Sequence, residues 1–150
     1  MPLPKLMNLS KHYQMNNPRK LCIYIAGKVT GEKLIDCHLK FHHWQIALES
    51  MGFDVANPMC LVKDFRTPWD AAMRTCVGEL VKCHAVFMLP CWQNSRGAKI
   101  EKQIAESLNI PVFTETEDLK RLAKTCQHAC SPADKYKGGK CDKMGYHETT

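Results

Sequence analysis

One carboxylate stands where a helix should present an apolar face. Residues 94–113, NSRGAKIEKQIAESLNIPVF, predict a helix followed by a short strand. With a turn of about 100° per residue, Glu101 lies about 40° from Gly97, inside the apolar arc formed by Ile100, Ile104, Ala105 and Leu108. A carboxylate facing a core is costly unless it has a partner or borders a cavity. Glu101 therefore either borders a ligand site at the end of a sheet or has a structural role. In the structural role, its side chain extends its carboxylate to solvent or forms a salt bridge with Arg96.

Two glycine-containing loops could hold an anion near Glu101. Residues 27–31, GKVTG, follow an apolar run, and residues 90–97, PCWQNSRG, lead into the helix of Glu101. Each loop feeds a helix N-terminus, which offers free N–H groups and a positive dipole. Alternatively, the glycines only form turns and the tryptophan only packs. In this interpretation the glycines let a ligand approach the backbone, the Thr, Ser and Arg side chains donate hydrogen bonds to it, and the tryptophan ring stacks on a base or sugar. The candidate binding residues are Gly27, Thr30, Gly31, Trp92, Ser95, Arg96 and Gly97.

Four short apolar runs are typical of strands buried on both faces. They lie in residues 21–27, 52–58, 84–90 and 110–113, and each is bounded by glycine, proline or a polar segment. None alternates between polar and apolar residues, as a strand with one solvated face would. The second run is expected to end in a turn at Pro58. These runs therefore predict a parallel sheet.

Helical periodicity separates the apolar runs. We expect a first helix over residues 31–51 and a second in residues 68–83, with Thr67 as its cap and Pro68 at its first position. The third helix is that of Glu101. Residues 116–124, TEDLKRLAK, predict a short final helix.

The alternation of strands and helices predicts an α/β fold. We expect a flavodoxin-like (Rossmann-like), three-layer, doubly wound parallel sheet of four to five strands, in the order 2-1-3-4. Ligands of such sheets bind beyond the strand C-termini, where the strand order reverses. Here that point lies between the first and third strands, so residues 27–31 and 90–97 should meet there.

The positive charge lies outside the predicted sheet. In residues 21–123, twelve Lys and Arg balance twelve Asp and Glu, and the excess of +6 belongs to residues 1–20 and 124–150. We therefore expect a flexible N-terminal arm (1–20), one α/β domain (21–123) and a basic tail (124–150). A neutral domain gives no strong case for nucleic-acid binding.

Cysteine usage indicates a reducing compartment. The chain has nine cysteines, an odd number, and begins with no secretory signal pattern. Cys22, Cys76 and Cys83 fall in or beside apolar segments and are expected to fill the core. No segment reaches the about 20 apolar residues of a membrane span. We therefore expect a cytoplasmic protein, in the host cytoplasm if it is phage-encoded.

The tail carries a possible metal-ligand pattern. Cys126, Cys130, Cys141 and His147 have the form C-x3-C-x10-C-x5-H, close to the spacing of structural zinc sites. The alternative is a disordered tail without metal, because few apolar residues separate these four. No other cofactor is expected.

Four segments together resemble a known family. They are IYIAGKVTG, ALESMGFDVANP, PWDAAMR and MLPCWQNSRGAKIEKQIAESLNIPVF. They resemble a phage and bacterial domain of unknown function that is similar to the nucleoside 2-deoxyribosyltransferases and the 2′-deoxynucleotide N-glycosidases. The resemblance covers about residues 21–115.

The resemblance implies cleavage or transfer at an N-glycosidic bond. Glu101, four positions after Gly97, matches the nucleophilic glutamate of these enzymes, and Tyr24 matches their first-strand tyrosine. Ser95 lies near where they hold a hydroxyl or phosphate. Cys76 stands where they carry an aspartate that assists the leaving base. The resemblance also implies a nucleoside or nucleotide ligand and a homo-oligomer, and the alternative function is nucleotide binding or sequestration without turnover.

Overall fold

Four parallel strands form the centre of the protein. The structure is a computed structural model that describes residues 20–129, with side chains described to residue 125. The sheet runs in the order β2 (Asp54–Ala56), β1 (Cys22–Ala26), β3 (Ala85–Met88) and β4 (Val112–Phe113). All three pairings are parallel. The predicted α/β class and the strand order 2-1-3-4 are therefore confirmed.

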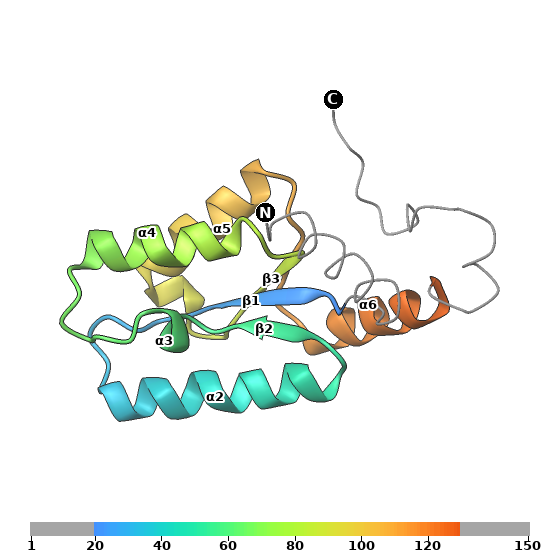
Figure 1. Ribbon diagram of the computed structural model, residues 1–150, viewed down its shortest axis with the longest axis horizontal. Coiled ribbons are helices and arrows are strands. Elements are labelled where there is room, and N and C mark those ends of the chain that lie inside the picture. The colour runs from blue at the N-terminus through green and yellow to red at the C-terminus, as the bar shows by residue number, and fades with distance from the viewer. Residues whose placement is uncertain (1–19, 130–150) are drawn as a thin grey trace, which may run out of the picture. The chain divides into compact units, whose positions relative to one another are not determined.

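Helices cover both faces of this sheet (Figure 1). On one face lie α4 (Trp69–Leu80) and α5 (Arg96–Ser107), and on the other lie α2 (Leu34–Ser50) and α6 (Thr116–Ala129). The short helix α3 (Pro58–Leu61) follows β2. Within the described residues, no helix is both long and apolar enough to cross a membrane.

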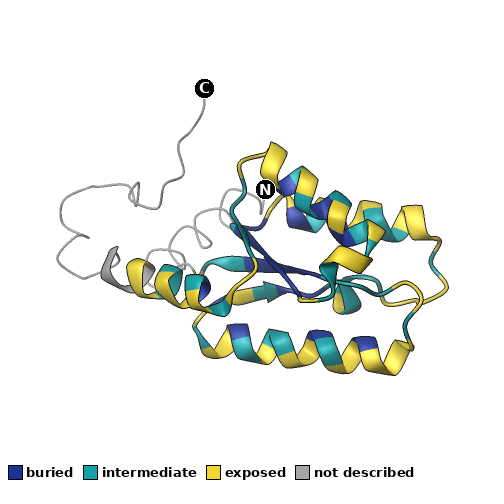
Figure 2. Cartoon of the chain, turned by 180° about the vertical axis from the view of Figure 1, so that it is seen from behind, coloured by how far each residue is buried: buried dark blue, intermediate teal, exposed yellow. Residues whose placement is uncertain are grey.

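Successive residues of β1 supply two separate cores. Tyr24 and Ala26 face α4 and α5, whereas Ile23 and Ile25 face α2 and α6. This alternation is the two-residue period of a strand, and all four side chains have no exposed surface. Figure 2 shows the resulting buried band through the middle of the molecule. Because both faces are covered, the run is apolar throughout.

Helix α2 and the segment after β2 differ from the sequence-based expectation. α2 begins at Leu34 instead of residue 31, because residues 29–32 form a turn in which the Glu32 N–H bonds to the Val29 carbonyl. Gly31 has a φ of +84°, a conformation outside a right-handed helix. At Pro58 the chain forms helix α3, where we expected only a turn, and Asn57 caps it by accepting from the Met59 N–H.

Helix ends also differ at three other places. The cap of α4 is Pro68, one residue later than predicted, and the Thr67 hydroxyl donates to the Asp64 carbonyl. Leu108 was expected in the buried arc of α5, but it lies past the last helical residue and is 54% exposed. Asn109, with a φ of 58°, then ends the helix as expected. α6 extends to Ala129 and is longer than predicted.

The compact unit of the described chain spans Leu21–Ala123. The arm predicted for residues 1–20 lies outside the described residues except for Lys20. The zinc ligands predicted at Cys126, Cys130, Cys141 and His147 also lie outside the residues whose side chains are described. In the described region, no group of three or more His, Cys, Asp or Glu could hold a metal ion.

Candidate functional site

The carboxylate of Glu101 is buried and has a tyrosine partner. Ser95 caps α5 by accepting from the Ala98 N–H, which places Glu101 in the second turn with its side chain toward β1. Glu101 is only 5% exposed. The Tyr24 hydroxyl donates to Glu101 Oε1 at 2.7 Å across the interface between β1 and α5. The alternative of an ion pair with Arg96 is wrong, since no such pair occurs among the described residues.

Burial raises the pKa of both groups. It raises the pKa of Glu101 to about 7, although the hydrogen bond from Tyr24 opposes this shift. It also raises the pKa of Tyr24 well above its usual range, and the neighbouring Glu101 charge adds to the effect. Tyr24 therefore remains a hydrogen-bond donor at neutral pH, while Glu101 changes charge near neutrality.

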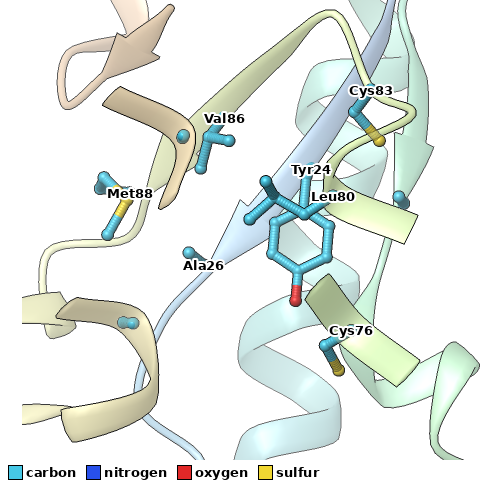
Figure 3. Close-up of a cluster of buried hydrophobic side chains, with 10 residues drawn as sticks. Tyr24, Ala26, Cys76, Leu80, Cys83, Val86 and Met88 are labelled. Carbon is cyan, nitrogen blue, oxygen red and sulfur yellow. The ribbon is translucent and has the colours of Figure 1, made fainter. Parts of the chain in front are cut away.

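Cys76 lies beside this pair. It is buried on α4 with its side chain near the hydroxyl end of the Tyr24 ring (Figure 3). Burial raises the pKa of the Cys76 thiol, the interaction with the Tyr24 hydroxyl opposes that shift, and the Glu101 charge adds to it. At neutral pH the thiol is therefore neutral and a poor proton donor.

Glu101 and Cys76 border a cavity of about 770 Å³. This volume suits a ligand of nucleotide size. Many of its apolar side chains come from α3, α4 and the segment between them, which also contributes Lys63 and Thr67, and the other parts of the wall add further polar and charged groups. The residues that line the cavity are Gly27, Val29, Thr30, Glu32, Leu34, Cys37, His38, Pro58, Met59, Val62, Lys63, Phe65, Thr67, Trp69, Ala72, Met73, Cys76, Asn94, Ser95, Arg96, Gly97, Ala98 and Glu101.

Most of the predicted site residues meet at this cavity. It is lined by Glu101, by Gly27 and Thr30 of the first loop, and by Ser95, Arg96 and Gly97 at the start of α5. The loops after β1 and β3 therefore converge beyond the strand C-termini, as parallel strands with this order require.

Three predicted residues lie outside the lining. Tyr24 is fully buried behind Glu101. Gly31 forms the turn before α2. Trp92 packs against the core on the α4–α5 face, with the Lys102 ammonium 5.4 Å from its ring centroid. Trp92 is therefore a packing residue, as the alternative interpretation of its role expected.

Gly27 is required for packing as well as for the loop. A Cβ on Gly27 would lie 2.9 Å from Leu89 Cδ1 and 3.1 Å from Leu89 Cβ. Leu89 is fully buried directly after β3, so it has little space to retreat. The missing side chain lets the backbone after β1 approach the end of β3.

The tryptophan that meets a cation at the cavity is Trp69, which the sequence analysis did not select as a site residue. The Arg96 guanidinium lies 4.3 Å from the centroid of the Trp69 ring, and both residues line the cavity. Trp69, Met73 and Cys76 recur at intervals of four and three residues, which places them on one face of α4. Only tertiary packing shows that the face borders a cavity.

Lys40 holds the first loop in place, and sequence reasoning also missed it. Its ammonium group donates to the Lys28 carbonyl at 2.7 Å and pairs with Glu32. The hydrogen bond from Lys40 lowers the pKa of Glu32. Lys40 is on α2 and its partners precede that helix, so no helical spacing signals the contact.

Comparisons with known proteins identify a family. No curated protein and no solved structure matches the chain. The sequence profile named domain of unknown function (DUF4406) matches residues 21–114. This range includes all four strands and every residue that lines the cavity. The chain therefore belongs to the DUF4406 family.

Proposed function

We propose that this protein cleaves or transfers the N-glycosidic bond of a nucleoside or nucleotide, with Glu101 as the nucleophile. The observation that carries the proposal is a 5%-exposed carboxylate at the wall of a nucleotide-sized cavity, with one tyrosine donor and no cationic partner among the described residues. A buried carboxylate without a cation is costly, so a functional reason for its position is expected. The resemblance to the deoxyribosyltransferases supports the same role.

The hydrogen bond from Tyr24 orients the nucleophile. Tyr24 engages Oε1 of Glu101, which leaves Oε2 to attack the anomeric carbon. Attack forms a glycosyl ester and releases the base, and water or a second base then takes the sugar from Glu101. Glu101 must be ionised for the first step. Its pKa of about 7 therefore predicts that base release rises with pH toward a plateau above neutrality.

The beginning of α5 is the proposed site for a phosphate group of the substrate. Free N–H groups and the helix dipole favour an anion there, and Arg96 adds a guanidinium. Trp69 and the 72%-exposed Phe65 line the cavity and offer ring faces to a base.

The test follows free base released from a panel of nucleoside monophosphates by chromatography. We expect release by the wild-type protein and a loss of at least about a hundredfold in Glu101→Gln, because Gln cannot form the glycosyl ester. Glu106→Gln is the matched control, since Glu106 is on the same helix but pairs with Lys102 at the surface. Equal release by wild-type and Glu101→Gln proteins would reject the nucleophile role.

Cys76 favours a second candidate function, which is nucleotide binding or sequestration without turnover. A neutral thiol lies beside Glu101 where the resembling enzymes have an aspartate. This function predicts stoichiometric nucleotide binding, measured by native mass spectrometry, and no base release over the same panel. The predicted homo-oligomer and the zinc site of the tail remain predictions, measurable by light scattering and by the metal content of the purified chain.

A further inference from the structure

Among the described residues, the groups that contact Glu101 include no strong proton donor. Its shifted pKa has two causes, burial and the hydrogen bond from Tyr24, and no charged side chain of the described region contributes. The Tyr24 hydroxyl already donates to Glu101, and the remaining neighbour, Cys76, is a buried thiol. The cavity-lining His38 and Lys63 belong to other elements of the wall, α2 and the segment after α3.

The charge of the base decides whether such a donor is needed. When a neutral base leaves, the electron pair of the broken C–N bond makes its ring nitrogen anionic, and a proton must arrive. When a cationic base leaves, the same electron pair neutralises the positive ring. The base then departs without a proton, and Glu101 supplies only the electron pair that forms the ester bond.

We propose that the substrate is a nucleotide whose base carries a permanent positive charge, such as an N7-alkylated purine or an N-glycosyl pyridinium. The proposal rests on the proposed glycosidic function and names the substrate class of the same site. In the first step, Glu101 Oε2 bonds to the anomeric carbon as the C–N pair returns to the ring. In the second step, water hydrolyses the ester and releases the sugar, a proton and the Glu101 carboxylate.

The wall of the cavity suits this class of ligand. Met59, Val62 and Met73 give an apolar surface for a flat ring, and Phe65 offers an aromatic face that attracts a cation. The buried Glu101 carboxylate gains a counter-charge when a cationic ring enters. A phosphate group on the same ligand would meet Arg96 at the start of α5, so a nucleotide with a cationic base matches both charges of the site.

The decisive experiment compares two substrates that differ by one methyl group and one charge. They are 7-methylguanosine 5′-monophosphate and guanosine 5′-monophosphate, each with the ribose and the 2′-deoxyribose sugar. Base release by the full chain is measured by chromatography, and the rate with Glu101→Gln is subtracted because methylated purines also depurinate spontaneously. We expect the methylated nucleotide to react at least about a hundredfold faster, since general acid catalysis contributes about that factor or more.

A substitution at Cys76 tests whether the lack of a proton donor beside Glu101 causes the preference for a cationic base. Cys76→Asp introduces a carboxyl beside the reacting bond, and we expect it to raise guanine release from the unmethylated nucleotide at least about tenfold. Cys76→Ser is the matched control, because it changes the thiol without adding an acid and should bring no such gain. A thermal melt of each variant shows whether the fold is retained.

The outcomes separate this inference from the function on which it rests. Equal Glu101-dependent release from both nucleotides would keep the glycosidic function and overturn the substrate class. Absence of release from either nucleotide and from the wider panel would overturn both. Preferential release from the methylated nucleotide supports the inference even if the Cys76 variants do not fold.

Discussion

The contact between Glu101 and Tyr24 combines two opposing electrostatic effects. Burial disfavours the charged carboxylate, and the tyrosine hydrogen bond favours it. The result is a group with a pKa of about 7 that is neutral in mild acid and charged in mild base. A structural carboxylate would be stabilised by a cation, as Glu32 is by Lys40. The absence of a described cation at Glu101 is therefore the feature that distinguishes it at the residue scale.

The raised pKa of Glu101 predicts how the stability of the protein depends on pH. The pKa of Glu101 is about 7 in the folded protein against an ordinary value of 4.5. Below pH 4.5 both states are protonated. Between these values the unfolded chain loses the proton and the folded chain keeps it, so the free energy of unfolding falls as pH rises, by about 3 kcal/mol in total.

Urea unfolding at pH 5 and pH 8 measures this effect. Glu101→Gln has no ionisable group at this position, so its stability should fall less between the two pH values than that of the wild type, by about 2.5 kcal/mol. Glu106→Gln, on the exposed side of α5, should behave as the wild type does. An identical pH dependence in wild-type and Glu101→Gln proteins would contradict the raised pKa.

At the scale of helices and strands, the position of the loop after β1 determines part of the shape of the cavity. The loop after β1 reaches the end of β3 because Gly27 has no side chain in front of Leu89. The same loop is held from the other side by Lys40 of α2, which binds the Lys28 carbonyl. The loop after β1, which forms part of the cavity wall, is thus fixed by contacts with the end of β3, distant in sequence, and with α2, the next element along the chain.

Gly27→Ala should therefore destabilise the fold by about 1–3 kcal/mol, because the buried Leu89 must move to accept a methyl group. Gly78→Ala is the matched control: Gly78 is an exposed residue inside α4, and a Cβ there meets nothing within 4 Å. It should stabilise the protein by about 0.5–1 kcal/mol, because alanine favours helices. Chemical unfolding of the two variants measures whether their changes in the free energy of unfolding have opposite signs. Equal stabilities would show that Leu89 does not restrict the side chain at position 27.

The whole domain is two cores that share one sheet. The core on the α4–α5 face includes Leu80, and the core on the α2–α6 face includes Ile25. Figure 1 shows the sheet between the two helical layers. Because the strands belong to both cores, neither core can persist without the other, and the described unit should unfold in one transition.

Substitutions on opposite faces should consequently add. Ile25→Val should cost about 0.5–1.5 kcal/mol and Leu80→Ala about 2–5 kcal/mol, by loss of buried methyl groups. The double variant should lose the sum to within about 0.5 kcal/mol, since the two side chains belong to different cores on opposite faces of the sheet. Urea unfolding followed by fluorescence and by circular dichroism checks this, and two separated transitions would show that the cores are independent.

The sequence by itself determined the elements, their order and the position of the unusual carboxylate. Apolar runs without alternation can be buried only between two layers, so they predicted a parallel sheet. The alternation with helices, together with the right-handedness of crossovers, led to the order 2-1-3-4, which the sheet has. The helical period placed Glu101 on the buried side of its helix, where it lies. All these features arise from interactions that repeat locally along the chain.

Only the tertiary structure decided which side chains meet. Tyr24 and Glu101 are 77 residues apart, and their hydrogen bond exists because β1 packs beneath α5. The partner of Arg96 is Trp69 instead of Glu101, and the side chain that holds the first loop comes from α2. Periodicity assigns a residue to a face but not to a neighbour on that face. The neighbours follow from how the layers stack, and no local pattern in the sequence contains that information.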